Sequence, residues 1–146
     1  MIRIIGIGSP FGDDRVGWRV VELLRDRLPA EVDLVALDRP GAALINWMEG
    51  VHWLILIDAL SSGAAPGSLI RIDPGNLELE SRLSSHDLAL SGTLRLAKSL
   101  GCLPSRIDIY GIELGDCQAT TLSDASALSA IQLTSLIEDE VAQYLV

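Results

Sequence analysis

Short apolar runs alternate with amphipathic segments along this chain, and that alternation restricts the fold more than any other feature. The apolar runs are typical of strands buried on both faces of a parallel sheet, and the amphipathic segments of surface helices. The sequence therefore predicts an α/β fold, a three-layer sandwich with helices on both faces of the sheet. Strands are expected at 2–7, 32–37, 53–57, 68–72 and 106–112, and helices are expected to end near Leu28, Gly50, Leu100 and Leu145.

One connection breaks the parallel pattern. The stretch from Ala59 to Gly67 is short and rich in Ser, Gly and Pro, so it does not provide the helical crossover that a parallel neighbour requires. We therefore expect Ser68–Ile72 to run antiparallel in a five-stranded, mostly parallel, twisted sheet. The third strand, Trp53–Ile57, is the most apolar and is expected to be central. Without a repeat or linker, residues 1–146 are expected to form a single domain.

Composition argues against several classes of function. A formal net charge of −9 repels phosphate backbones and anionic lipid, so nucleic acid and membrane surfaces are poor partners, whereas a cation or a basic protein fits better. No apolar run approaches the roughly 20 residues that cross a bilayer. The first residues lack a secretory signal pattern, which predicts a cytoplasmic location. Cys102 and Cys117 have the spacing of neither a disulfide framework nor a zinc site, and both are expected to be reduced thiols.

Four polar side chains are expected at one edge of the sheet. In α/β folds, ligands bind beyond the carboxyl ends of the parallel strands, where helices also begin. Asp14 begins the first helix, Asp58 ends the third strand, His86 begins the third helix and Glu113 ends the last strand. His52 starts the third strand, so it belongs to the opposite edge and is not a candidate ligand. Glu113 is not included among the candidate ligands.

The glycines after the first strand allow two interpretations. Gly6 and Gly8 follow a strand and Asp38 ends the next one, as in a dinucleotide-binding fold. However, the third glycine is Gly12, one residue too far for the G-x-G-x-x-G spacing, and Pro10 removes a backbone N–H that would bind pyrophosphate. Two aspartates then occupy the helix start, where phosphates would otherwise bind. This turn is therefore expected to face a cation.

The adjacent aspartates Asp13 and Asp14 are expected to differ in role. An aspartate at a helix start commonly caps free N–H groups for about 1 kcal/mol, and one cap needs one aspartate. We assign a cap or local structural role to Asp13 and a functional role to Asp14. Taken alone, Asp58 is equally explained as a turn-initiating acid and His86 as a solvent-facing helix residue. Together, Asp14, Asp58 and His86 make a suitable ligand set for a divalent metal such as Ni²⁺ or Zn²⁺.

The sequence resembles the hydrogenase maturation endopeptidases, a peptidase family that removes a C-terminal extension from the nickel-iron hydrogenase large subunit. Matching segments stand in the family's order along most of the chain, and this ordered set is more specific than any one segment. The segments are Gly6-Ile7-Gly8 through Asp13-Asp14-x-x-Gly17, Leu54-Ile55-Leu56-Ile57-Asp58-Ala59, Pro66-Gly67, Ser85-His86-x-x-x-Leu90 and Gly111-Ile112-Glu113. The resemblance implies that Asp14, Asp58 and His86 are the catalytic and metal-contacting residues.

The resemblance also implies an activity, a metal and a partner. The expected reaction is cleavage of the large-subunit precursor after nickel insertion, with the precursor's own nickel as the recognition element. Zinc or cadmium is expected to occupy the same site in vitro, and the protein is expected to be a monomer. A carboxylate and a metal-bound water are both candidates for the group that attacks the peptide bond.

Two residues depart from the family's pattern. Ser9 stands where the family usually has Asn, and it is expected to hydrogen-bond locally. Arg15 stands where a small residue is usual, and we expect it to pair with Asp13 or to face solvent instead of turning toward the metal site. Two alternative functions remain: a Rossmann-like nucleotide-binding module built on the glycine turn, and a metal-binding assembly factor that grips the precursor without cutting it.

Overall fold

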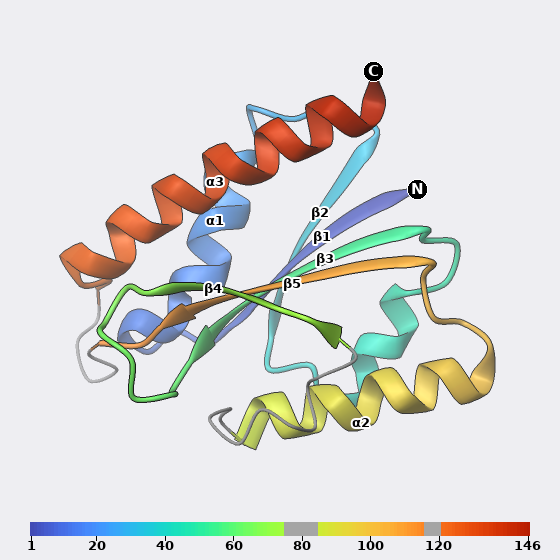
Figure 1. Ribbon diagram of the computed structural model, residues 1–146, viewed down its shortest axis with the longest axis horizontal. Coiled ribbons are helices and arrows are strands. Elements are labelled where there is room, and N and C mark those ends of the chain that lie inside the picture. Colours follow the sequence, from blue (N-terminus) through green and yellow to red (C-terminus); the bar gives the residue numbers. More distant parts are fainter. Residues whose placement is uncertain (75–84, 116–120) are drawn as a thin grey trace.

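A computed structural model describes residues 1–74, 85–115 and 121–146, with side chains described for all of these except 85–89. Five strands form one sheet in the order β2-β1-β3-β5-β4 (Figure 1). The strands are β1 (Ile2–Gly8), β2 (Val32–Asp38), β3 (Trp53–Leu60), β4 (Leu69–Ile72) and β5 (Arg106–Glu113). The α-helices are α1 (Val16–Leu24), α2 (Ser85–Leu100) and α3 (Asp124–Leu145), and two 3-10 helices are η1 (Gly12–Arg15) and η2 (Gly41–Trp47).

The strand directions confirm the predicted sheet. β1 is parallel to β2 and β3, and β3 is parallel to β5. Only β4, among the strands described, is antiparallel to its neighbour, β5. β3 is the middle strand and all of its side chains are buried, as its continuous hydrophobicity predicts. It extends to Leu60, beyond the predicted end at Ile57, because β5 continues to pair with it as far as Glu113 opposite Leu60.

Helices cover both faces of the sheet, which confirms the three-layer architecture (Figure 1). α1 and α3 pack together on one face, and η2 and α2 pack together on the other. Alternate residues of a strand point to opposite faces. In β3, Ile55 and Ile57 therefore join the core beside α1 and α3, whereas Leu54 and Leu56 join the core beside α2. Burying each such side chain contributes about 1.5–3 kcal/mol, so both cores support the sheet.

Glycines bring α1 into direct contact with the sheet backbone. A Cβ atom on Gly17 would lie 2.6 Å from the carbonyl oxygen of Ile7 and 2.7 Å from that of Ile57. A Cβ atom on Gly6 would lie 2.3 Å from the carbonyl oxygen of Gly17. Separations this short leave no room for a side chain. Gly17 therefore allows α1 to pack closely against the sheet.

The helix boundaries correct part of the sequence prediction. The first helix begins as η1, and neither η1 nor α1 has a side-chain cap, so the predicted capping by Asp13 or Asp14 is wrong. α1 ends at Leu24, not near Leu28, because the chain closes into turns and Pro29 disfavours helical geometry at the residue before it. At α3 the Ser123 hydroxyl caps the helix, since it accepts a hydrogen bond from the Ser126 N–H at 3.3 Å.

A cluster of charged and aromatic groups joins α3 to the amino ends of β3 and β5. The Asp108 carboxylate accepts hydrogen bonds from Trp53 Nε1 at 2.7 Å and from Arg71. The Tyr110 hydroxyl donates to Glu140 of α3 at 2.9 Å. Burial opposes ionisation of Asp108, but the hydrogen bonds from Trp53 and Arg71 and the nearby positive charges hold the pKa of its carboxyl below the usual value. This cluster stabilises the fold at the edge opposite to the predicted site.

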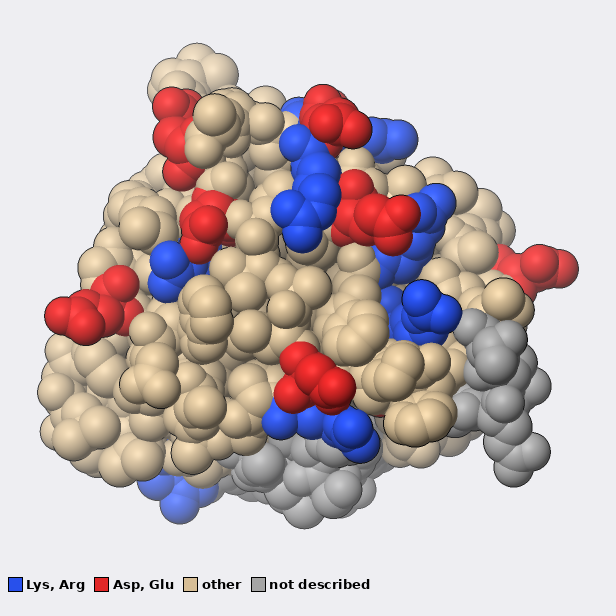
Figure 2. Space-filling view, turned by 180° about the vertical axis from the view of Figure 1, so that it is seen from behind, with Lys and Arg blue, Asp and Glu red and all other residues tan. Residues whose placement is uncertain are grey.

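The surface mixes charges of both signs. Figure 2 shows one face on which acidic and basic side chains adjoin each other in several places across a largely uncharged surface. Pairs such as Arg19 with Glu22 and Arg27 with Glu138 contribute little stability individually, since both partners are solvent-exposed. None of the described helices is long and apolar enough to cross a membrane. Cys102 has a free thiol, and Cys117 lies outside the described residues.

Candidate active site

The carboxyl edge of the parallel strands gathers the backbone positions of the predicted triad. Asp14 lies in η1, directly after β1, and Asp58 lies near the end of β3. His86 is the second residue of α2. Figure 1 shows the start of α2 on the same side of the molecule as the carboxyl ends of β3 and β5. The fold thus brings the three segments to one edge, as the position of strand ends in α/β folds predicts.

Asp58 is a buried carboxylate that faces the α2 side of the sheet. Its neighbours Leu56 and Leu60 belong to the core on that side, and alternation along the strand gives Asp58 the same direction. Only 7% of the residue is exposed. The N–H of Ala59 donates to Asp58 Oδ1 at 2.8 Å, which fixes the orientation of the carboxylate. Burying a carboxylate costs free energy unless hydrogen bonds, an opposite charge or a bound cation compensate for the lost water. A buried carboxylate beside a cavity is therefore a strong candidate for a functional residue.

Asp14 is half-buried and is held by the turn that follows β1. The hydroxyl of Ser9 donates a hydrogen bond to the Asp14 carboxylate, and the Ser9 N–H donates to the Asp14 carbonyl oxygen at 3.2 Å. Ser9 itself is 1% exposed, so the local hydrogen bond expected of it is confirmed. Arg15 is exposed. Two hydrogen bonds from Ser9 therefore hold Asp14 at the end of β1.

Asp13 is fully buried and connects the first turn to the segments on either side of residues 116–120. Its carboxylate accepts hydrogen bonds from the N–H of Gly115 at 2.7 Å, the N–H of Ser123 at 2.7 Å and the Ser123 hydroxyl at 2.8 Å. These partners lie more than a hundred residues along the chain. Asp13 therefore has the structural role assigned to it, although it joins distant segments instead of capping its own helix.

Glu113 also has structural partners. Its carboxylate accepts hydrogen bonds from the Ser62 N–H at 2.7 Å, from the Ser62 hydroxyl and from the Ala64 N–H at 3.1 Å. The side chain is 2% exposed and shapes the loop between β3 and β4. His52 lies at the other end of β3, with its ring 6.1 Å from that of Tyr144 between centroids. Both positions agree with leaving these residues out of the ligand set.

The third member of the predicted triad is placed only by its backbone. His86 lies in the first turn of α2, and its side chain falls outside the described residues. Among the side chains that are described, no group of three His, Cys, Asp or Glu residues is arranged to hold a metal ion. The ligand set of Asp14, Asp58 and His86 therefore remains a prediction.

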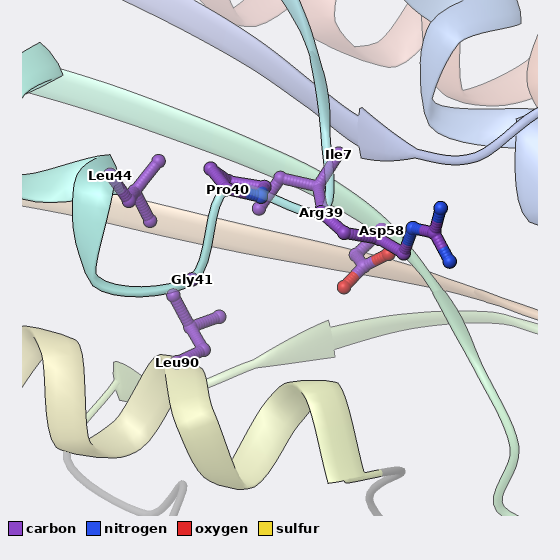
Figure 3. Close-up of a pocket in the computed structure, with 7 residues that line it drawn as sticks. All are labelled: Ile7, Arg39, Pro40, Gly41, Leu44, Asp58 and Leu90. Carbon is purple, nitrogen blue, oxygen red and sulfur yellow. The ribbon is translucent and has the colours of Figure 1, made fainter.

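A cavity of about 220 Å³ opens beside Asp58 at this edge (Figure 3). Its walls come from the ends of β1 and β3, from the turn between β2 and η2, from η2 itself and from α2. The lining residues are Ile7, Arg39, Pro40, Gly41, Leu44, Asp58 and Leu90. Asp58 and Arg39 are the charged residues of this lining, and most of the remainder is apolar. This volume and the apolar lining suit a single apolar side chain.

Arg39 is the site residue that sequence reasoning missed. It follows Asp38, which ends β2, and the rule that placed Asp14 and Asp58 at the carboxyl edge applies equally to β2. The signal was therefore available in the sequence. Asp38 was considered as a ribose-binding acid, but it is exposed and accepts a hydrogen bond from Arg39 Nε at 2.9 Å.

The fold and this edge define a class: a three-layer α/β protein with a cavity that contains a buried carboxylate at the carboxyl ends of its parallel strands. A model of the hydrogenase maturation protease family matches residues 18–144. The chain belongs to this family. The matched range includes Asp58 and His86 and begins just after the turn that contains Asp14.

Individual relatives agree with the family match. The chain is 28% identical over 129 residues to the hydrogenase expression/formation protein HupD of Rhodobacter capsulatus, covering 84% of this chain and 59% of the relative. It is 33% identical over 119 residues to HupM of Azotobacter chroococcum mcd 1, covering 77% of this chain and 56% of the relative. The chain thus spans less than two thirds of the length of these curated relatives.

The fold is shared with a solved structure, the hydrogenase maturating endopeptidase HybD from E. coli. The TM-score is 0.85 at 23% identity, and the similarity covers 98% of this chain and 93% of that one. The two proteins therefore share their fold over nearly the whole of this chain.

Proposed function

We propose that this chain is an endopeptidase that removes the C-terminal extension of a nickel-iron hydrogenase large-subunit precursor after nickel insertion. The proposal depends above all on one observation: in a member of the hydrogenase maturation protease family, a buried carboxylate, Asp58, lines a cavity at the carboxyl edge of the sheet. That edge is where α/β folds bind their ligands. The volume and the apolar lining of the cavity suit a peptide side chain.

Peptide hydrolysis requires proton transfers that a carboxylate can perform. The oxygen of water bonds to the carbonyl carbon, the C–N bond breaks, and a proton moves to the nitrogen that leaves. A base that takes the proton from water and passes it to the leaving nitrogen assists both steps. In our proposal Asp58 is this base, because its carboxylate is sheltered from bulk solvent and oriented by the Ala59 N–H.

Nickel enters this proposal as part of the substrate, since it arrives in the precursor. Two carboxylates, Asp14 and Asp58, and one imidazole, His86, supply the oxygen and nitrogen donors that suit a divalent metal of borderline softness. Contact with the precursor's nickel would fix the nearby peptide bond relative to the catalytic groups, which is a positioning effect. Zinc or cadmium is proposed to occupy the same position in vitro.

The proposed partner and setting follow from charge and chemistry. The formal net charge of −9 favours a basic surface on the partner around the processed C-terminus. We propose that the protein acts as a monomer in the cytoplasm.

The test compares nickel-loaded with nickel-free precursor. Each form is incubated with the purified protein, and the mass of the large subunit is measured over time. We expect a C-terminal mass loss from the loaded form alone. Stable binding without mass loss would support the non-cleaving assembly factor instead, and saturable nucleotide binding would support the Rossmann-like module.

A further inference from the structure

Arg39 has a backbone conformation that arginine rarely adopts. Its φ is +40°, and it is the one non-glycine residue with a positive φ in the described parts of the chain. Its N–H donates to the carbonyl oxygen of Gly8 at 3.1 Å, which ties this turn to the end of β1. Strained residues of this kind persist where surrounding structure imposes them, and they concentrate at functional sites. The chain therefore retains an arginine where glycine would be easier to accommodate.

The side chain of Arg39 reaches the cavity that contains Asp58. Figure 3 shows it extending from the turn after β2 in the direction of Asp58, with Leu44 and Leu90 on the walls. Nε donates to Asp38 at 2.9 Å, and 48% of the side chain is exposed. A guanidinium has five N–H donors in a rigid plane. With Nε bonded to Asp38, the terminal nitrogens remain as donors beside Asp58, on the side away from Leu44 and Leu90 in Figure 3.

The cavity combines apolar walls with two opposite charges. Ile7, Leu44 and Leu90 offer no hydrogen bonds, so they suit an uncharged apolar side chain. A peptide that inserts such a side chain must also bring its main-chain carbonyl oxygens to the rim, and each loses water there. A guanidinium donor at the rim satisfies one of these oxygens and leaves Asp58 available for proton transfer.

We propose that Arg39 is a substrate-binding residue: its guanidinium hydrogen-bonds a main-chain carbonyl oxygen of the precursor residue whose apolar side chain fills the cavity beside Asp58. This inference rests on the proposed function, and it identifies a contact to the peptide in addition to the contacts with nickel. Asp38 serves as the positioning residue that orients the guanidinium.

The decisive variant is Arg39→Gly, because glycine adopts a positive φ without strain. We expect its melting temperature to be unchanged or higher than that of the wild type. We expect kcat/KM for nickel-loaded precursor to fall by roughly 10- to 100-fold, the range for losing a hydrogen bond from a charged donor, mainly through a higher KM. Millimolar guanidinium ion should restore part of the lost rate. Arg39→Lys should retain more activity than Arg39→Gln.

Arg19→Gln is the matched control, since Arg19 is similarly exposed, pairs with Glu22 on α1 and is not part of the cavity lining. Its kcat/KM should equal that of the wild type. If the wild type cleaves the precursor and Arg39→Gly has kcat/KM within twofold of it, the inference about Arg39 is wrong and the proposed function stands. If the wild type leaves nickel-loaded precursor intact, the proposed function itself fails. A loss of activity with a lowered melting temperature would assign Arg39 a structural role.

Discussion

Replacing Asp13 by alanine is predicted to destabilise the fold, whereas the same change at its neighbour Asp14 is not. The Asp13 carboxylate accepts the three hydrogen bonds from Gly115 and Ser123 and is fully buried. A hydrogen bond to a charged group contributes about 1.5–3 kcal/mol, but bonds that share one carboxylate are not additive. Because the partners are only partly buried, we expect a loss of about 2–4 kcal/mol in the free energy of unfolding.

The assay is urea denaturation followed by a thermal scan. Asp13→Ala should lower the urea midpoint with an unchanged m-value, and should lower the melting temperature by roughly 5–15 °C. Asp14→Ala removes one hydrogen bond at a half-buried position, so its effect should stay within about 1 kcal/mol. The exposed Asp26 provides a control, and Asp26→Ala should stay within about 0.5 kcal/mol. Equal stabilities of Asp13→Ala and Asp26→Ala would refute the structural role of Asp13.

Three further predictions concern stability. In the urea assay, Gly17→Ala should lower the free energy of unfolding by more than about 2 kcal/mol, because the added Cβ would meet backbone oxygens. Gly92→Ala in α2 should raise it by about 0.4–1 kcal/mol, because the added Cβ would meet nothing within 4 Å. Because the pKa of Asp108 is lowered in the folded protein, the contribution of its carboxylate to the free energy of unfolding is complete above about pH 4 and is lost at lower pH. The difference in this free energy between wild type and Asp108→Asn should therefore shrink as the pH falls below about 4. A constant difference would contradict this. Glu113→Gln should loosen the loop at Ser62, seen as faster amide hydrogen exchange there, and unchanged exchange would contradict the proposed loop contact.

The sheet was predictable from the sequence because its determinants are local. The length of the connection from Ala59 to Gly67 was sufficient to indicate the antiparallel strand, and the hydrophobicity of β3 indicated its central place. Its end at Leu60 was not predictable, because strand length depends on how far β5 continues to pair. The close contact between Gly17 and the sheet backbone depends on the packing of α1 against β1 and β3, and the structure is needed to show it.

The sequence predicts which edge of the sheet carries the site, but not which side chains contact one another there. The topology brings the segments of Asp14 and Asp58 together, and the sequence rule for α/β sheets captures that. The partners of Asp13 lie 102 and 110 residues away, and no local pattern indicates them. Arg39 follows a strand end at the same edge, so its position there was predictable, but the path of its long side chain depends on the turn between β2 and η2 and was not.

The central claim is that Asp14, Asp58 and His86 form the site that processes nickel-loaded precursor. Its most direct test is the initial rate of C-terminal mass loss with Asp14→Asn, Asp58→Asn and His86→Ala, beside Asp26→Asn as a control. We predict that each of the first three variants keeps the wild-type melting temperature within a few degrees and loses at least about 100-fold in rate, as expected when a general base or a positioning contact is removed. The control should process normally. Nickel-dependent processing at the wild-type rate by all three variants would contradict the assignment.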